Sequence, residues 1–278
     1  MSKVELTIEN RVAVMVLNDP ASRNALTGQE MLEPLVAGIA EAAAQALVLV
    51  VTGEGSAFSA GGNVKDMASG SGLFGGSPEE ILEGYRTSIQ RLTRSMAETD
   101  LVTIAAVNGP AVGAGFDLAL GCDLRVGSPA ARFSHTFVDL GLIPGDGGAW
   151  LLTRNLGAQR AAELSFTGRV VEAEEAVRLG ILLEVTDRLR PRALELATMI
   201  ADKPAHSLRF TKRLLRQAPS MDLDGFLEYS AALQAVSHHT DAHRSALGAY
   251  VETLESRRRA AANPSSSSPT ANVTKQPD

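Results

Sequence analysis

The chain has 278 residues, of which 45% are hydrophobic, 21% charged and 4% aromatic, and its formal net charge is −6 at pH 7. These values are ordinary for a soluble globular protein, and the length allows one large domain or two small ones. The acidic balance and the lack of a basic stripe before the run 257–259 argue against a nucleic-acid-binding protein.

The single cysteine and the polar N-terminal segment indicate the cellular compartment of the protein. A single Cys122 excludes an intramolecular disulfide, and the apolar run around it predicts a buried thiol. The N-terminal segment lacks the apolar stretch of a signal peptide, and no window of about 18 apolar residues predicts a membrane span. We therefore expect a cytoplasmic protein that makes no membrane contact.

Apolar runs and breakers in chain order predict βαβ units followed by a helical region. Alternating or unbroken apolar runs favour strands, and the capping patterns at Thr27 with Glu30 and at Ser77 mark helix starts. The predicted strands are Val4–Ile8, Arg11–Leu17, Ala46–Thr52, Val102–Val107, Leu124–Gly127, Ala131–Ser134 and Ile181–Val185. The predicted helices are Gly28–Ala44, Ser77–Glu98, a helix from Ala114, Gly148–Leu156, Ala158–Phe166, Glu172–Leu179 and the stretch from Pro191 to Ala262.

The order of these elements divides the chain into three parts. Crossover connections imply mostly parallel strand pairing in an α/β core over residues 1–195. Residues 196–262 are expected to form a C-terminal helical region. Residues 263–278 have almost no apolar content and are expected to be a disordered tail. The Gly/Ser-rich segment Ala68–Ser77 predicts a mobile loop within the core.

Two glycine-rich turns, Ala57–Lys65 and Ala105–Asp117, each follow an apolar strand. A helix beginning near Ala114 would present free N–H groups and the positive end of its dipole. Such a turn suits an anion or a developing oxyanion. Close packing of a helix on a strand demands the same small residues, so the pattern alone leaves both interpretations open.

Three other chemistries fit these residues poorly. A serine hydrolase would use Ser59 with His135 and Asp139, but the first glycine of the nucleophile elbow is missing. A dinucleotide fingerprint fails because Leu118 replaces its third glycine. The pair His239 and His243 lacks the glutamate of a metalloprotease helix, so no metal is expected.

Several blocks, in order, resemble the crotonase (enoyl-CoA hydratase/isomerase) superfamily. An N-terminal segment N-D-P…R-N-A-L is similar to the family's segment near CoA, and the two glycine-rich turns are similar to its oxyanion-hole blocks. Later stretches are similar to its L-G-x-x-P-x-x-G-G and T-G…A-x-E-A blocks. The resemblance covers roughly residues 4–255. It implies a spiral of ββα units, a C-terminal helical region that forms homotrimers or dimers of trimers, an acyl-CoA substrate, and no separate cofactor.

The resemblance also implies site residues. Two backbone N–H groups, those of Ala60 and Ala114, would hold the thioester oxygen as it becomes enolate-like. Alanine at 114 is tolerable if its φ is negative. The expected substrate- and CoA-binding residues are Arg23, Ala25, Leu26, Ala60, Gly61, Gly62, Asn63, Gly113 and Phe137.

The chain departs from the family pattern at its catalytic positions. Hydratases of the family use two glutamates; Asp117 stands at the first position and Phe137 at the second. Since phenylalanine carries no proton, Asp146, His135 or Asp139 would have to act instead, Asp139 if the stretch after Phe137 is extended.

These residues favour a particular reaction. Aspartates without a second glutamate suit proton transfer along an enoyl-CoA, so we expect double-bond isomerisation ahead of hydration. The alternative is a non-catalytic acyl-CoA-binding homologue that has lost the second glutamate. The acyl group itself is not readable from the sequence.

Overall fold

The computed structural model describes residues 2–262; the tail predicted for 263–278 lies outside the described residues. The chain divides into two compact units, one ending at Arg216 and one beginning at Gln217. The first unit therefore extends beyond the predicted core boundary at residue 195. Helix α10 (Ala205–Gln217) explains this, because Lys212 Nζ is buried and lies 2.8 Å from Asp123 Oδ2 of the core.

A six-stranded sheet in the order β1-β2-β3-β4-β6-β9 forms the centre of the first unit. Only β1 and β2 pair antiparallel, and the other neighbours are parallel, which confirms the predicted mostly parallel pairing. A smaller sheet has the order β5-β7-β8. The strands are β1 (Val4–Glu9), β2 (Val12–Leu17), β3 (Val48–Gly53), β4 (Val102–Val107), β5 (Pro110–Val112), β6 (Leu124–Gly127), β7 (Arg132–Ser134), β8 (Val171–Glu172) and β9 (Glu184–Val185).

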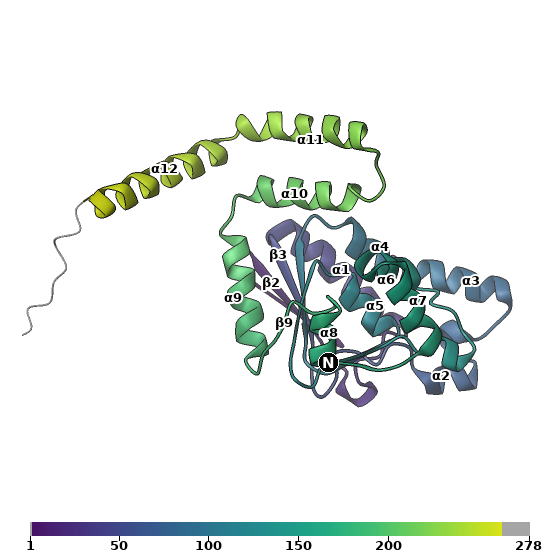
Figure 1. The fold of residues 1–278 in the computed structure, drawn as a ribbon. Coiled ribbons are helices and arrows are strands. Elements are labelled where there is room, and N and C mark those ends of the chain that lie inside the picture. Colours follow the sequence, from purple (N-terminus) through teal and green to yellow (C-terminus); the bar gives the residue numbers. More distant parts are fainter. Residues whose placement is uncertain (1, 263–278) are drawn as a thin grey trace, which may run out of the picture. The chain divides into compact units, whose positions relative to one another are not determined.

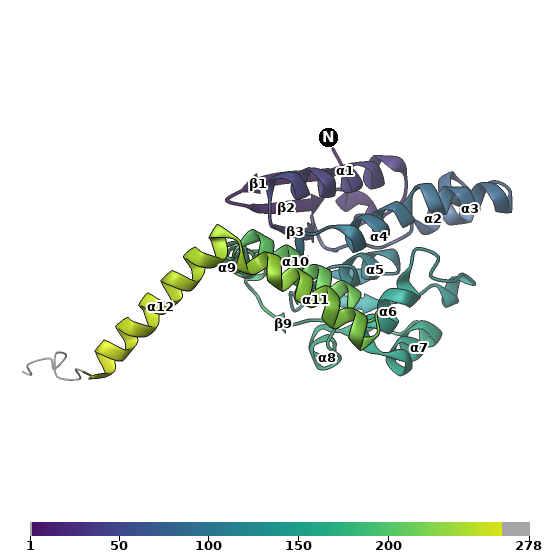
Figure 2. The same cartoon turned by 90° about the horizontal axis from the view of Figure 1, so that it is seen from above.

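Helices cover both faces of the large sheet (Figures 1 and 2), as expected for parallel strands joined by crossovers. The α-helices of the first unit are α1 (Gln29–Gln45), α2 (Val64–Ser69), α3 (Pro78–Thr87), α4 (Ile89–Glu98), α5 (Ala114–Leu120), α6 (Gly148–Leu156), α7 (Ala158–Thr167), α8 (Ala173–Arg178), α9 (Leu189–Ala201) and α10. The 3-10 turns are η1 (Pro20–Ser22), η2 (Gly72–Phe74) and η3 (Val138–Leu140).

Strand β3 shows why its sequence is an unbroken apolar run. Leu49 and Val51 enter the core cluster that holds residues of α1, α4 and α5. Val48 and Val50 point to the opposite side and pack with Leu189 and other residues of α9. Because successive side chains of a strand alternate between its faces, a strand buried on both sides must be apolar at every position.

Cys122 lies in the first of these clusters, as predicted. The thiol is buried, and this burial raises the pKa of Cys122 to about 12. It therefore behaves as a packed apolar group rather than as a reactive one.

Two local predictions at helix starts had opposite outcomes. Ser77 caps α3 and forms a complete capping box with Glu80, which confirms the predicted start. Thr27 does not cap α1: Gly28, with φ of +80°, precedes the helix, and Glu30 bonds to Lys3 instead. The prediction for Thr27 was wrong because a partner distant in sequence takes the glutamate.

Other boundaries also differ from the prediction. The single helix predicted for Ser77–Glu98 is broken at Ser88, whose φ and ψ are −119° and −99°. The segment predicted as a loop at Ala68–Ser77 contains the end of α2 and the turn η2. Strand β5 was missed because its three residues are too few for a periodic pattern.

The second unit holds α11 (Leu223–His238) and α12 (Asp241–Ala262) in its described part. None of the residues of α11 is buried, and Leu227, Val236, Leu247 and Tyr250 are exposed. No described helix of either unit is both long and apolar enough to cross a bilayer.

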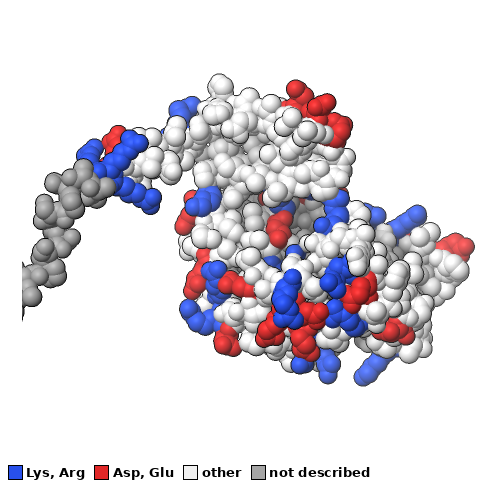
Figure 3. Space-filling model, in the orientation of Figure 1, with Lys and Arg blue, Asp and Glu red and all other residues white. Residues whose placement is uncertain are grey.

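Charged side chains of both signs are interleaved on the face of the first unit in view in Figure 3. Many are paired across elements: Arg132 contacts Glu172, and Arg169 contacts both Glu163 and Glu175. Surface pairs of this kind contribute little to stability.

Candidate active site

The two glycine-rich turns lie side by side in the structure. Phe58 N and Ser59 N donate to Pro110 O, and Val112 N donates back to Ser59 O at 3.0 Å. At Gly61 a Cβ atom would stand 2.3 Å from Val112 O and 3.1 Å from Ala114 N. Only glycine allows this approach, which brings the two turns together at the N-terminus of α5.

Asn24 fixes the segment beside the first turn. Its buried amide donates to the carbonyl oxygens of Glu54, Ala57 and Phe58, and its Oδ1 accepts from Asp19 N. The residue adopts φ of +57°, a conformation that asparagine tolerates better than most residues. This anchoring role was not predicted, although Asn24 stood within the motif.

The two predicted oxyanion donors differ in availability. Ala114 is the first residue of α5, so its N–H has no acceptor within the helix. It is absent from the non-glycine residues with positive φ, as the prediction required. The Ala60 N–H, in contrast, donates to Arg23 O at 2.9 Å. That bond occupies the donor, so the assignment of Ala60 is corrected.

Gly62, two residues further along the same turn, has a backbone N–H that is available. Among residues 2–262 its N–H has no hydrogen-bond acceptor, and Gly61 N is held by Ser59 Oγ at 3.1 Å. The same Ser59 hydroxyl donates to Asn24 O at 2.7 Å. Ser59 is thus a buried structural residue, and no hydrolase triad with His135 and Asp139 forms.

Asp117 and Asp146 are buried together at the start of α6. Asp117 is 3% exposed and Asp146 is 4% exposed. Asp117 projects from α5 against Gly148, where a Cβ atom would stand 2.3 Å from its Oδ2. Both Asp117 oxygens and Asp146 Oδ1 are buried without a hydrogen-bond partner among the described residues. Buried polar atoms are rarely left unpaired, so this pair of carboxyl groups is a candidate catalytic site.

Burial and proximity change the protonation of this carboxyl pair. Burial raises the pKa of Asp117 to about 7, against a smaller lowering by the neighbouring side chain of Asp146. Burial and the charge of Asp117 raise the pKa of Asp146 well above its usual range. Ionisation of one carboxyl group disfavours ionisation of the other, because two like charges in one buried site repel each other, and such a pair titrates as a coupled unit.

The loop that carries Asp146 is held by α4. Gln90 Nε2 donates to Gly145 O at 2.8 Å, and Thr93 Oγ1 donates to Asp146 O at 2.7 Å. Tyr85 of α3 packs on Gly145, and burial and the charge of Asp146 raise the pKa of its hydroxyl. Residues from two helices, α3 and α4, therefore fix the backbone of the loop that carries this carboxyl group.

Of three further predicted residues, His135 and Phe137 lie near this pair and Asp139 lies away from it. His135 is 1% exposed, and its Nε2 lies 3.4 Å from Asp117 Oδ1. The Phe137 ring stands 4.8 Å from the His135 ring and covers Gly113 beside Ala114. Asp139 is exposed and lies over Gly168, because η3 curls the chain where an extended stretch was assumed. The prediction that Asp139 shares a face with Phe137 was wrong.

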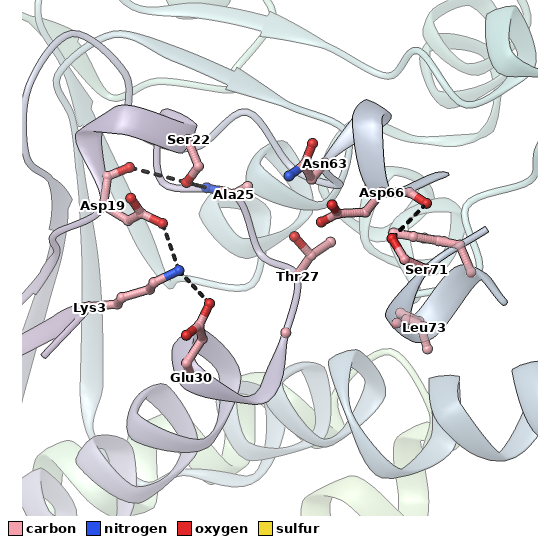
Figure 4. Close-up of a pocket in the computed structure, with 13 residues that line it drawn as sticks. Lys3, Asp19, Ser22, Ala25, Thr27, Glu30, Asn63, Asp66, Ser71 and Leu73 are labelled. Atoms are coloured by element: carbon pink, nitrogen blue, oxygen red, sulfur yellow. Dashed lines mark hydrogen bonds and ion pairs between the residues drawn. The ribbon is translucent and has the colours of Figure 1, made fainter. Parts of the chain in front are cut away.

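A separate hollow of about 390 Å³ lies between the segment 19–30 and the α2–η2 segment (Figure 4). Ala25 and Asn63, two of the predicted CoA-binding residues, line it. Lys3 is held between Asp19 and Glu30, and Asp66 adds a further acid. Asn63 also caps α2 by accepting from Lys65 N. The carboxyl pair does not line this hollow.

Comparisons with known proteins bear on this geometry. The family model described as "Enoyl-CoA hydratase/isomerase" matches residues 7–258. The chain is 40% identical over 219 residues to "Probable enoyl-CoA hydratase EchA14" of Mycobacterium tuberculosis, covering 78% of this chain and 82% of that protein. It is 30% identical over 258 residues to the short-chain-enoyl-CoA hydratase of Clostridium acetobutylicum, covering 91% and 95%.

Solved structures agree with the sequence relatives. The enoyl-CoA hydratase structure from Bacillus anthracis superposes with a TM-score of 0.83 at 29% identity, covering 90% of this chain and 96% of that one. The predicted α/β spiral with a C-terminal helical region is thereby confirmed. The chain belongs to the enoyl-CoA hydratase/isomerase family of acyl-CoA metabolism.

Proposed function

We propose that the protein isomerises the double bond of an enoyl-CoA by moving a proton through Asp117 and Asp146. The observation that carries this proposal is the buried pair of unpartnered carboxyl groups beside the N-terminus of α5. Phe137, where the family pattern has its second glutamate, leaves this pair as the only carboxyl groups buried at the site among residues 2–262.

The thioester oxygen would be held by the N–H groups of Gly62 and Ala114. Both are free in the structure, and the close approach at Gly61 supports their convergence on one oxygen. The dipole of α5 adds to the stabilisation of the developing enolate. Loss of one such donor typically slows a reaction about 10²–10³-fold.

A pair that shares one proton always contains one base and one acid. The ionised carboxylate takes a proton from C2 of a 3-enoyl-CoA, and the negative charge moves onto the thioester oxygen. The protonated partner then delivers its proton at C4, and the double bond settles between C2 and C3. The pair ends with one proton, as it began, so protons and electrons balance without a cofactor.

Hydration is the second candidate, and the printed names of the relatives favour it. Addition of water to a 2-enoyl-CoA also needs one base and one acid, which the same pair supplies. Water would then have to enter beside Phe137, an apolar side chain.

The test is mass spectrometry of a panel of 2-enoyl- and 3-enoyl-CoA substrates incubated with the protein in D₂O. Deuterium uptake without added mass of water supports isomerisation, and a product heavier by one water supports hydration. No change in any substrate, with binding retained, would mean a non-catalytic acyl-CoA-binding protein and overturn the proposal.

Asp117→Asn and Asp146→Asn should each lower the rate about 10²–10⁴-fold, because each removes one half of the proton transfer. Asp139→Asn is the matched control, since Asp139 is exposed and outside the pair. An equal loss in the control would show a general electrostatic effect instead.

A further inference from the structure

A chain of polar contacts runs from α7 to the carboxyl pair. Ser165 Oγ lies 3.2 Å from His135 Nδ1, and His135 Nε2 lies 3.4 Å from Asp117 Oδ1. Ser165 is half-buried on α7, whereas the ring of His135 is 1% exposed. Ser165 lies outside the two glycine-rich turns and outside the positions of the two family glutamates.

The surroundings of His135 leave it few other partners. Phe137 stands edge-on at 4.8 Å and Phe116 at 6.5 Å between ring centres. The titratable groups that face the imidazole are Asp117 from α5 and Asp146 from the loop before α6. Within residues 2–262, His135 Nε2 makes no hydrogen bond. Asp117 Oδ1 faces it at 3.4 Å.

Burial lowers the pKa of His135, with only a smaller opposite effect from Asp146. The imidazole is therefore neutral at pH 7 and has a single N–H, on one nitrogen or the other. Which nitrogen bears the proton is set by the partner of the other nitrogen.

The tautomer of His135 depends on its two neighbours, Ser165 and Asp117. If Ser165 donates to Nδ1, the proton of the ring stands on Nε2 and faces Asp117 Oδ1, which suits an ionised Asp117. If the proton stands on Nδ1, the lone pair of Nε2 faces Asp117, which suits only a protonated Asp117. The tautomer of His135 and the charge of Asp117 are thus coupled.

We propose that Ser165 and His135 are positioning residues that make Asp117 the ionised member of the carboxyl pair, so that Asp117 is the base and Asp146 the acid. The proposal rests on the proposed proton transfer for its kinetic consequence, but the tautomer itself does not depend on turnover. The 3.4 Å contact needs only a small ring movement to become a hydrogen bond, and such bonds are often long before substrate binds.

The first test reads the tautomer directly. Long-range ¹H–¹⁵N spectra of the full chain at pH 8 resolve the ring nitrogens of its 5 histidines, and His135→Gln identifies the signal of His135. The expected result is a neutral ring protonated at Nε2. In Ser165→Ala the signal should move toward a mixture of both tautomers, while Ser165→Thr, which keeps the hydroxyl, should retain the wild-type spectrum. A ring protonated at Nδ1 in the wild type overturns the proposal.

The second test reads the pH profile of deuterium exchange into the enoyl-CoA. Removing a hydrogen bond to the ionised form of Asp117 raises its pKa, so the acidic limb of Ser165→Ala should shift upward by up to about 1 pH unit. KM and the melting temperature should stay near wild type, and Ser165→Thr should restore the limb. An unshifted limb in Ser165→Ala contradicts the proposal.

The two tests separate this inference from the proposed function. If no substrate turns over but the Nε2 tautomer is present and depends on Ser165, the proposed reaction fails and the positioning contact stands. If exchange occurs with a wild-type limb in Ser165→Ala, the reaction stands and the positioning role fails.

Discussion

In the proposed reaction Asp117 and Asp146 act as base and acid, and both are buried away from water. An exposed carboxylate is fully ionised at pH 7 and is too weak a base to take a proton from carbon at a useful rate. Burial raises the pKa of Asp117 to about 7, which matches a base to neutral pH. The cost of burial thus becomes part of the mechanism.

This burial has a consequence for stability. The folded protein binds protons at Asp117 and Asp146 more tightly than the unfolded chain, whose carboxyl pKa is near 3.8. Stability contributed by the protonated pair is present below that value and is lost as pH rises toward about 7. The double variant Asp117→Asn, Asp146→Asn should therefore be stabilised relative to wild type by a few kcal/mol at pH 8, and by little at pH 4.

Urea unfolding of the wild type and the double variant at several pH values measures this difference. Asp139→Asn serves as control because its carboxyl is exposed. A stability difference that did not grow with pH would show that ionisation of the carboxyl pair does not destabilise the folded protein.

Asn24 is the second residue whose role depends on burial. Its side chain satisfies carbonyl oxygens of Glu54, Ala57 and Phe58. Asn24→Ala should lower the free energy of unfolding by about 2–4 kcal/mol, because Glu54 O and Phe58 O lose the Asn24 donor and only Ala57 O keeps another, Asn108 Nδ2. It should also lower the rate, since the turn carrying Gly62 loses its anchor. Asn108→Ala is a useful comparison, because Asn108 also bonds to Ala57 O but has an exposed partner at Gly55 O.

At the scale of elements, the start of α6 decides how the carboxyl of Asp117 is held. Gly148 lies so close that a Cβ atom would meet both carboxyl oxygens. Gly148→Ala should displace Asp117 and reduce the rate about 10-fold or more, as small misplacements of catalytic groups do. Ala149→Ser, at the exposed neighbouring position, should leave the rate unchanged. Steady-state kinetics of both variants measures the effect, and an active Gly148→Ala enzyme would show that Asp117 need not stay where it lies.

Local signals explain which elements the sequence could predict. The capping box at Ser77 involves residues only three apart in sequence. The unbroken apolar run of β3 likewise indicates, by itself, that the strand is buried on both faces. The helix start at Ala114 could be predicted because the glycine-rich turn and the helix that follows are contiguous, whereas Asp117 was singled out by the family resemblance. The outcome at Thr27 depended on a distant partner of Glu30, Lys3, and the outcome at Asp139 on the short turn η3, neither of which a periodic pattern contains.

The candidate site shows the same limit. The pairing of Ser165 with His135 spans 30 residues and joins a helix to a strand end, so neither segment signals it alone. The sequence pointed to the N–H of Ala60 and not to that of Gly62, because which amide of a turn is occupied depends on Arg23 O. Family resemblance supplied the blocks, and only the folded chain shows which atoms they leave unpaired.

At the scale of the whole molecule, the second unit leaves much apolar surface uncovered. Leu227 is 54% exposed and Leu247 is 51% exposed in helices that bury little of their own surface. Several large apolar side chains exposed on two successive helices are typical of an interface. We propose that these helices join copies of the chain into a trimer or a dimer of trimers, as the family resemblance implies.

Light scattering after size-exclusion chromatography tests this assembly. The wild type should have the mass of a trimer or hexamer, and Leu227→Glu with Leu247→Glu should shift it toward monomer. Glu228→Gln, an exposed change on the same helix, should not. A monomeric wild type at micromolar concentration would contradict the proposal.

The burial of Cys122 has a consequence for a protein that handles thioesters. An acyl group can pass from CoA to any thiolate it meets, and the chain carries one cysteine. With a pKa of about 12, only about one thiol in 10⁵ is ionised at neutral pH. Self-acylation at sulfur is therefore suppressed both by access and by acidity. The one thiol of the chain is in this way protected from reaction with an acyl-CoA thioester.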